Sequence, residues 1–338
     1  MTDRHRPARP GVAVLGAGVV GARVARELIS SPDAPLVTIV SSRADRVRAL
    51  REAFGADAVV LHSAAGHAAL PGSVRVVVLA GEPEGQAGVA RHHLQLGRHV
   101  VSSADVPETV AELLDLHDEA RAAALSVVAG AAFSPGLSCL LAAHAALGLD
   151  TVDEVHVARH GAGGPLCARE RLRSMRATTK EWRDGAWVAA SSGSGRELCW
   201  FPDPVGPRDC YRVATGEALL LVDAFAGLHR ATVRMAMSRR DRLMLPLPIL
   251  LPAPPEGGVG ALRVEVRGSR DGARRTEVLG CLDRPGMAAG AVAAEATLGL
   301  LRGEAPAGAH GLAAWGRSTE LLAALRVRGV RVATLDGE

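Results

Sequence analysis

Three glycines near the start of the chain have the spacing of a phosphate-binding turn. Gly16, Gly18 and Gly21 follow an apolar run at residues 12–15 and precede a helical pattern of apolar residues. The first glycine permits a tight turn, the second leaves room for a pyrophosphate, and the third lets helix and strand pack closely. The helix N-terminus would offer N–H groups and the positive end of its dipole. A purely structural turn is the alternative, but the strand-to-helix context favours a dinucleotide site made by Gly16, Ala17, Gly18, Val19, Val20 and Gly21.

The residues about twenty positions later bear on which dinucleotide is bound. Ser41, Ser42 and Arg43 stand where an acid would bind the ribose 2′-hydroxyl of NAD. Two hydroxyls and a guanidinium suit a 2′-phosphate instead, because arginine pairs with phosphate through two N–H groups. We therefore predict NADP as the cofactor, with NAD as the other candidate. Ser42 could also cap the helix expected at residues 44–54, and the two roles are compatible.

Small and polar residues follow several of the later predicted strands. Because ligands bind at the carboxyl edge of a parallel sheet, we expect contacts there to cofactor and substrate. The expected cofactor contacts are Ala80, Gly81, Ser102, Ser103 and Asp105. The expected substrate contacts are Phe133, Ser134, Pro135 and Gly136, where serine and proline suit a helix start whose N–H groups could bind a carboxylate. A plain helix cap is the competing interpretation.

Candidates for proton transfer lie further along the chain. His160, next to a glycine-rich turn at residues 161–165, is the first choice, followed by Lys180 and Tyr211. A positioned histidine or lysine could protonate an amine nitrogen as hydride arrives. His156 and Asp209 are further candidates, with Cys210 as an outsider, and an ordinary surface or half-buried position is the competing interpretation for each histidine. Gly163, Gly164 and Arg169 are expected near the substrate, although a solvated helix face would also explain the arginine.

The elements that would position these residues alternate between strand and helix in the first half of the chain. Strands are expected at residues 36–40, 59–61, 74–80, 99–102 and 125–129, and helices at 44–54, 86–96, 107–124 and 137–147. Such alternation predicts an α/β fold, a Rossmann-type doubly wound parallel sheet covered on both faces. Residues 1–10 are expected to be a flexible tail and 11–149 the dinucleotide-binding domain.

The pattern changes near residue 150. Strands are expected at 151–160, 218–221, 231–237, and at 261–267 and 276–282, where Asp271-Gly272 predicts a hairpin. Helices are expected at 167–178, 287–301 and 319–327, an irregular stretch at 190–211, and a packed or lid-like loop at 243–255, which contains five prolines. We therefore predict a second, α+β domain at 150–303, built on a mostly antiparallel sheet for substrate binding and dimerisation, and a helical segment at 304–338 that could return to the first domain.

Composition excludes several classes of protein. Hydrophobic residues make up 48% of the 338, and the net charge is only +3 with the basic residues scattered, which gives no reason to expect nucleic-acid binding. The five cysteines form no C-x-x-C, and the histidines and acids lack metal-ligand spacing, so neither a disulfide framework nor a metal site is predicted. With no signal-peptide core and no run of eighteen apolar residues, we expect a cytoplasmic protein that does not span a membrane.

Several of these motifs together resemble the saccharopine dehydrogenase-like oxidoreductases. The glycine fingerprint, the sequence Phe133-Ser134-Pro135-Gly136 after a strand, the later glycine-rich turn and the alanine-rich helix ending near Gly303 are similar to that family. The resemblance implies a nicotinamide cofactor, hydride transfer to or from an imine/amine or carbonyl/alcohol of a small carboxylated substrate, and a homodimer. Because Lys180 is the only lysine of the chain, any acid or base role that depends on a lysine must fall on Lys180 or be absent.

Two other functions stay open. A sugar dehydrogenase of the Gfo/Idh/MocA type shares the two-domain plan, but such proteins resemble one another in an E-K-P motif after the fifth strand, where this chain has Ser103-Ala104-Asp105. A non-catalytic NADP-binding sensor or scaffold would need no proton donor. Turnover of NADPH distinguishes the sensor from both enzymes.

Overall fold

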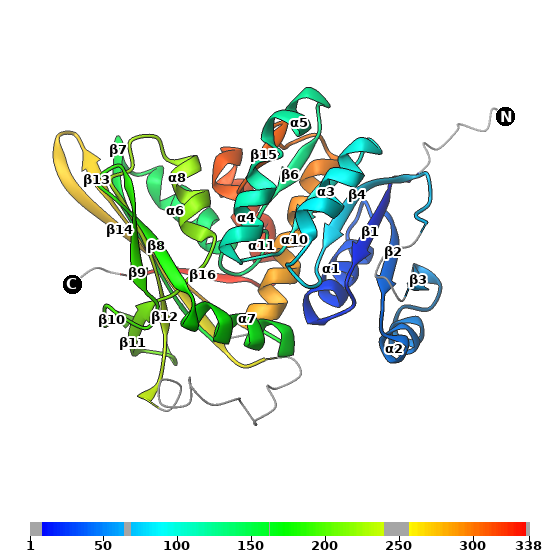
Figure 1. The fold of residues 1–338 in the computed structure, drawn as a ribbon, viewed down its shortest axis with the longest axis horizontal. Helices are drawn as coiled ribbons and strands as arrows, with labels where there is room; N and C mark the ends of the chain where they lie inside the picture. Colours follow the sequence, from blue (N-terminus) through cyan, green and yellow to red (C-terminus); the bar gives the residue numbers. More distant parts are fainter. Residues whose placement is uncertain (1–8, 64–68, 162, 240–256, 336–338) are drawn as a thin grey trace.

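The chain folds around two β-sheets that lie side by side (Figure 1). A computed structural model describes residues 9–63, 69–161, 163–239 and 257–335. The first sheet is parallel, with strand order β15-β6-β5-β4-β1-β2-β3, and the second is mixed and mostly antiparallel. The predicted fold class is therefore confirmed. The loop expected at 243–255 and most of the predicted tail lie outside the described residues.

The parallel sheet and its helices come mostly from the first half of the chain. Its strands are β1 (Gly11–Leu15), β2 (Leu36–Ser41), β3 (Ala58–His62), β4 (Val74–Leu79), β5 (His99–Ser102), β6 (Ser126–Val128) and β15 (Gly308–His310). The helices between them are α1 (Val19–Ile29), α2 (Ala44–Phe54), α3 (Gln86–Gln95), α4 (Pro107–Leu114), α5 (His117–Ala122) and α6 (Leu137–Ala146), with a 3₁₀ turn η1 (Gly55–Asp57). The carboxyl ends of these strands form one edge of the sheet, and the predicted cofactor contacts lie at or just after these ends.

The second sheet has strand order β10-β11-β12-β7-β13-β14-β16, with the β8–β9 hairpin attached to β12. Its strands are β7 (Thr151–His160), β8 (Thr178–Arg183), β9 (Ala186–Ser191), β10 (Glu197–Trp200), β11 (Pro207–Arg212), β12 (Arg230–Ala236), β13 (Gly260–Arg270), β14 (Ala273–Asp283) and β16 (Arg331–Thr334). The other elements are α7 (Pro165–Arg176), α8 (Glu217–Ala224), α10 (Pro285–Leu301), η2 (Leu312–Trp315) and α11 (Ser318–Val327). Helices α6 and α8 pack on the sheet face turned toward the first domain (Figure 1).

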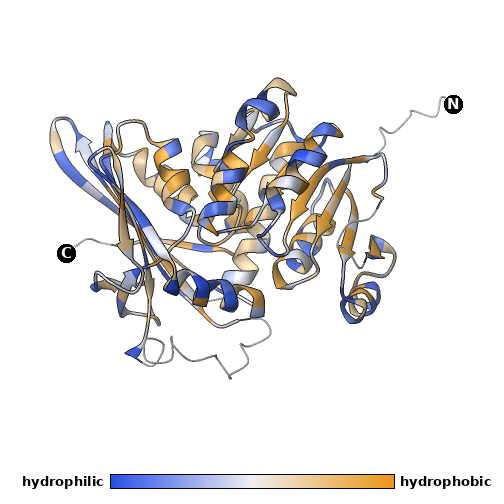
Figure 2. Cartoon of the chain, in the orientation of Figure 1, coloured by the Kyte–Doolittle hydropathy of each residue, from blue (hydrophilic) through white to orange (hydrophobic). Residues whose placement is uncertain are grey.

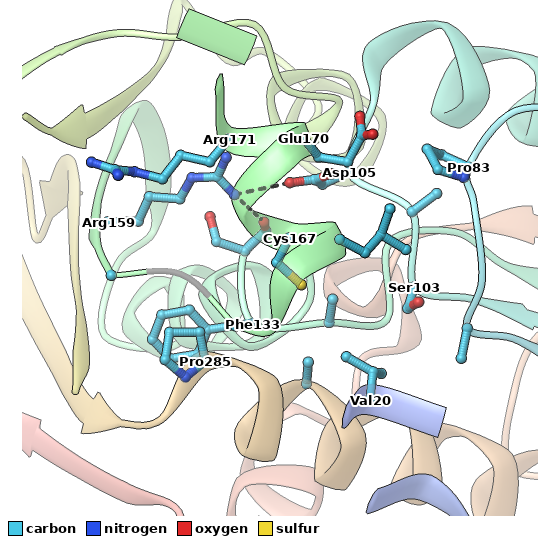
Figure 3. A pocket seen from close by; sticks show the side chains of 18 of the residues that line it. Val20, Pro83, Ser103, Asp105, Phe133, Arg159, Cys167, Glu170, Arg171 and Pro285 are labelled. Carbon is cyan, nitrogen blue, oxygen red and sulfur yellow. Dashed lines mark hydrogen bonds and ion pairs between the residues drawn. The ribbon is translucent and has the colours of Figure 1, made fainter. Parts of the chain in front are cut away.

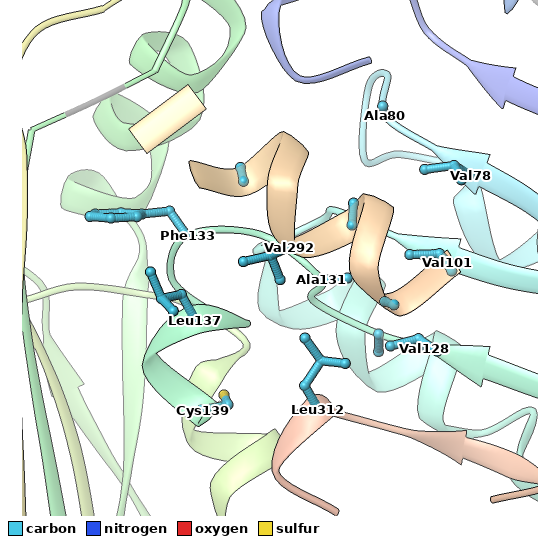
Figure 4. Close-up of a cluster of buried hydrophobic side chains, with 14 of the residues drawn as sticks. Val78, Ala80, Val101, Val128, Ala131, Phe133, Leu137, Cys139, Val292 and Leu312 are labelled. Atoms are coloured by element: carbon cyan, nitrogen blue, oxygen red, sulfur yellow. The ribbon is translucent and has the colours of Figure 1, made fainter. Parts of the chain in front are cut away.

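The hydrophobic core is continuous between the two domains. Strand β4 is buried on both faces, since Val76, Val77 and Val78 are all fully buried. Helix α10 lies against α1, β4 and β5, and its many alanines and glycines let these elements approach closely. In Figure 4 the α10 side chain Val292 belongs to the same cluster as Val101 of β5. The colours of Figure 2 show the apolar strands of the parallel sheet enclosed by helices with polar outer faces.

The structure changes some of the predicted elements. The stretch 218–221, predicted as a strand, lies in helix α8, because a short run of leucines fits a buried helix as well as a strand. The helix predicted at 107–124 is two helices, α4 and α5. The stretch 190–211, expected to be irregular, contains β10 and β11. The predicted hairpin is present, with positive φ angles of 51° at Asp271 and 74° at Gly272.

Helix α10 and the last segment both contact the first domain. Although α10 lies within the predicted second domain, it packs on α1. Strand β15 extends the parallel sheet beside β6, whereas β16 joins the second sheet beside β14. Among the helices described, none combines the length and the apolar character that crossing a bilayer requires.

Candidate cofactor and substrate site

The glycine turn between β1 and α1 has three glycines with three different surroundings. A Cβ added to Gly16, whose φ is +118°, would lie 2.6 Å from the carbonyl carbon of Ala80, and one added to Gly21 would lie 1.9 Å from the Gly16 oxygen. The main chain itself excludes side chains at both positions. At Gly18, φ is −74° and an added Cβ would meet nothing within 4 Å. Gly18 therefore borders open space at the N-terminus of α1, where a pyrophosphate fits.

Ser41, Ser42 and Arg43 lie at the end of β2, and an acid, Asp45, follows two residues later. The Arg43 Nη2 donates to Asp45 Oδ2 at 2.6 Å and its Nε to Oδ1 at 3.2 Å. The guanidinium holds the pKa of the exposed Asp45 carboxyl below its usual range. The Arg43 N–H donates to Ser41 Oγ at 3.1 Å. Helix α2 begins with Arg43 as its N-cap and has no side-chain cap, so Ser42 does not cap it.

A pocket with about 810 Å³ of empty space lies between the two domains (Figure 3). Loops after β4, β5 and β6 form one side, and β7, β12 and α7 form the other. Eight residues expected to contact cofactor or substrate line it: Val20, Ala80, Gly81, Ser103, Asp105, Phe133, Ser134 and Gly163. The same pocket is also lined by residues that the sequence did not single out, above all Arg159, Cys167, Glu170 and Met235.

Arg159 joins the two domains at the pocket. Its side chain is only 10% exposed, and Nη1 donates to Asp105 Oδ2 at 3.1 Å and to the Ser134 carbonyl at 2.8 Å. Its buried Nε has no hydrogen-bond partner within the described chain. Arg159 therefore orients two of the loops that were predicted to bind ligand and brings a positive charge to the wall of the pocket.

A buried carboxylate supports the turn at residues 133–136. Glu217, at the start of α8, is fully buried and accepts hydrogen bonds from Ser134 Oγ at 2.6 Å and from Ser138 Oγ. Burial raises the pKa of Glu217 above its ordinary value. Pro135 and Gly136 are buried in this turn and do not line the pocket, although both were expected near substrate. Their place is behind the wall that Phe133 and Ser134 form.

Ser102 is likewise a support for the site. It is fully buried, and its hydroxyl donates to Gln86 Oε1 at 2.7 Å. The Gln86 Nε2 in turn donates to the carbonyls of Gly81 at 3.3 Å and Glu82 at 3.0 Å. These hydrogen bonds fix the loop after β4 relative to β5. The buried hydroxyl of Ser102 therefore supports the loop that lines the pocket at Gly81.

Helix α7 closes the pocket on the side of the second domain. Glu170 has a side chain only 11% exposed, and burial, with smaller contributions from Asp105 and Glu82, raises its carboxyl pKa. Burial also raises the pKa of the Cys167 thiol.

Arg169, expected to bind substrate, instead points outward and pairs with Glu82 at 2.7 Å, with both side chains more than 60% exposed. That ion pair connects α7 to the loop after β4, and Gly164 is the N-cap of α7.

The three residues expected to transfer protons are outside the set that lines the pocket. His160 follows Arg159 on β7, so its side chain faces the opposite side of the sheet, where its ring lies 6.2 Å from that of Phe201. Lys180 is exposed on the β8–β9 hairpin. Tyr211 is buried in the same cross-strand row as Met235 and Arg159, two strands from the latter.

The further candidates lie elsewhere in the second sheet. His156 contacts Glu154 Oε2 and Thr232 Oγ1, each at 2.8 Å. Asp209 pairs with Arg196 at 2.9 Å, and Cys210 is buried in a small cluster with Cys199. Within the described ranges, no three His, Cys, Asp or Glu side chains are grouped so that they could hold a metal ion.

Comparisons with known proteins agree with this geometry. Residues 11–130 match the model of GFO_IDH_MocA, an oxidoreductase family with an NAD-binding Rossmann fold. Apo saccharopine dehydrogenase (L-Glu forming) from Saccharomyces cerevisiae has a similar fold, with a TM-score of 0.70 and 16% identity over 96% of this chain and 100% of that chain. DAP dehydrogenase from C. glutamicum in complex with DAP gives a TM-score of 0.50 at 17% identity, over 90% and 93% of the two chains.

These findings bear differently on the separate predictions. At such low identity the structural likenesses show the fold alone, whereas the family model identifies an oxidoreductase with an NAD(P)-binding Rossmann domain. The prediction of a nicotinamide-dependent oxidoreductase is thereby confirmed. The family model that matches is that of the Gfo/Idh/MocA type, which the sequence offered as an alternative, and not that of the saccharopine dehydrogenase type.

Proposed function

We propose that this oxidoreductase transfers hydride between NADP and an imine/amine or carbonyl/alcohol carbon of a small carboxylated substrate. The observation that carries the proposal is the pocket between the domains, which joins the nucleotide-binding edge at Ala80, Gly81 and Ser103 to the buried Arg159. A nicotinamide at that edge supplies hydride chemistry when bound. The guanidinium of Arg159, which lines the pocket, suits a carboxylate, since arginine binds carboxylates through paired N–H groups.

The chain's own residues would bind and orient both ligands. The open space at Gly18 and the first turn of α1 would hold the pyrophosphate, while Ser42 and Arg43 would contact a 2′-phosphate. The preference for NADP rests on the Arg43 guanidinium, and a 2′-phosphate would compete with Asp45 for its Nε and Nη2. The network from Ser102 through Gln86 would keep the nicotinamide edge rigid. Phe133 would exclude water on one side of the substrate.

A second candidate is a sugar dehydrogenase of the Gfo/Idh/MocA type, which the family model over residues 11–130 favours. Against it, no lysine is found among the described residues that line the pocket, and Ser103-Ala104-Asp105 stands after β5. Such a dehydrogenase would need a different proton carrier here. The homodimer implied by the resemblance also belongs to the proposal, with sedimentation velocity as its test.

Steady-state assays distinguish the candidates. Oxidation of NADPH is followed by absorbance with pyruvate, 2-oxoglutarate and glyoxylate, each alone and with glycine, alanine, glutamate or lysine. Reduction of NADP⁺ and NAD⁺ is followed with inositol and hexoses. We expect turnover in the first set. Turnover in the sugar set alone supports the second candidate, and NADPH binding with no turnover in either set supports a sensor.

A further inference from the structure

The pocket contains few groups that can exchange a proton near neutral pH. Among its described lining residues the titratable side chains are Asp105, Cys167, Glu170 and two arginines, and an arginine stays protonated. Because hydride transfer to C=N or C=O requires a proton at the heteroatom, one of the other three must hold it, or water must enter. His160, Lys180 and Tyr211 are outside this set.

Asp105 and Cys167 are poorly suited to donate. Asp105 Oδ2 accepts a hydrogen bond from Arg159 Nη1 at 3.1 Å, so this carboxyl is already engaged in an ion pair across the pocket. Burial raises the pKa of the Cys167 thiol above its ordinary value, so the thiol is a weak acid at neutral pH. Neither group is therefore well placed to give a proton to a ligand.

Glu170 differs from both because of where α7 places it. In Figure 3 its carboxyl lies close to that of Asp105 on one wall of the pocket, and its side chain is only 11% exposed. The charged groups around it are Asp105 and Glu82, which disfavour ionisation, and Arg173 and Arg169, which favour it. Arg173 Nη1 is 3.4 Å away on a largely exposed side chain, so its attraction is screened by solvent.

These surroundings separate the two carboxyls into an acid and a counter-ion. Two carboxyl groups that share a site ionise at different pH values, and the environments of each decide which one keeps the proton. The Asp105 carboxyl is held in an ion pair with Arg159, whereas burial is the largest influence on Glu170 and raises the pKa of its carboxyl against the attraction of Arg173. The Glu170 carboxyl, with its raised pKa, lines the same pocket as Ser103 and Arg159.

We propose that Glu170 is the proton donor in the reduction and the proton acceptor in the reverse oxidation. This role rests on the proposed hydride transfer. As the substrate carbon gains hydride and forms its new C–H bond, the π electron pair of C=N or C=O moves to the heteroatom. The Glu170 O–H bond breaks and the proton forms the N–H or O–H bond of the product. Glu170 is left as a carboxylate that water reprotonates, and the cofactor is oxidised.

The first part of the test needs neither cofactor nor substrate. The protein is labelled with ¹³C at the glutamate side-chain carboxyls and titrated by NMR, and the Glu170 resonance is the one that disappears in Glu170→Gln. We expect it to titrate above the ordinary glutamate value of about 4.3, and lower in Asp105→Asn. Titration at or below the ordinary value would overturn the proposal.

The second part measures catalysis. With a substrate found in the panel above, Glu170→Gln should lower kcat at least about 100-fold. The wild-type reduction rate should fall at high pH, and this fall should be absent in the variant. The Kd for NADPH should change less than about twofold. Glu320→Gln, an exposed position on α11, is the matched control and should keep wild-type kcat and pH profile. Thermal midpoints verify folding. A variant that keeps the wild-type kcat and pH limb refutes the donor role alone, whereas a wild type without turnover refutes the proposed function and the donor role with it.

Discussion

Replacing Glu217 by alanine tests how the turn at residues 133–138 is held. The carboxylate is fully buried and accepts hydrogen bonds from Ser134 Oγ at 2.6 Å and from Ser138 Oγ. Its removal leaves two buried hydroxyls without acceptors, each costing about 1–3 kcal/mol, while the cost of burying the charge is recovered. We expect a net loss of about 3 kcal/mol in the free energy of unfolding, within the usual range for breaking a buried polar network.

Urea denaturation followed by circular dichroism measures this loss. With a slope of about 3 kcal/mol per M, the midpoint should fall by about 1 M. A double-mutant cycle with Ser138→Ala should show coupling of at least about 1 kcal/mol, because the two groups contact each other. Glu320→Ala is the control. A loss under about 1 kcal/mol for Glu217→Ala, or additive single and double variants, would refute the reasoning.

The same site predicts a pH dependence of definite sign. Burial raises the pKa of Glu217 in the folded state, so folding favours its protonated form. Its contribution to stability is fully present below the unfolded pKa of about 4.3 and is lost as pH rises through the folded pKa. The difference in unfolding free energy between wild type and Glu217→Gln should therefore fall with rising pH in that window. A flat or rising difference contradicts the prediction.

Three further predictions concern the cofactor, a buried histidine and the ion pair across the pocket. Changing Ser42 to Asp and Arg43 to Ala should lower the preference for NADPH over NADH at least about tenfold in fluorescence titrations, and an unchanged preference would show that the 2′-phosphate is not bound there. Burial lowers the pKa of His310, whose Nδ1 accepts a hydrogen bond from Trp315 Nε1 at 3.0 Å. In urea unfolding from pH 7.5 to 5, the free energy of unfolding should therefore decrease as pH falls below about 6.5 and through the folded pKa. His310→Gln should remove that part of the dependence of stability on pH. Glu82→Gln breaks the exposed ion pair to α7, worth about 0–1 kcal/mol, so the stopped-flow dissociation rate of NADPH should change less than about fivefold; a larger change would mean that the pair controls opening.

Local patterns in the sequence were enough to predict the parallel sheet and its glycine turn. Gly18 borders open space and Gly21 meets the main chain of Gly16 within the turn, whereas Gly16 meets the main chain of Ala80 after β4. The Asp271-Gly272 hairpin depends on two residues that accept positive φ angles, which is also a local property. Where a single turn or a strand buried on both faces determines the structure, residue types suffice.

The residues that face the pocket depend on packing that no local pattern contains. The alternation of β7 shows that Arg159 and His160 point to opposite faces, but not which face meets the first domain, and the sequence analysis chose His160. Glu217 was hidden in a run of leucines interpreted as a strand. Glu170 lies in a basic helix whose arginines suggested a solvated face, and only the tertiary structure places it beside Asp105. For Arg159, an arginine in an otherwise half-buried strand was the available signal.

The central claim is that bare main chain at the first turn seats the pyrophosphate of the cofactor. The most direct measurement is the Kd for NADPH, from fluorescence titration of the wild type and of Gly18→Val, a substitution that fills space where an added Cβ meets nothing within 4 Å. The account predicts micromolar binding by the wild type, and for the variant an unchanged thermal midpoint with binding weakened at least about tenfold, or about 1.4 kcal/mol. Equal binding by both proteins, or no binding by the wild type, would contradict it.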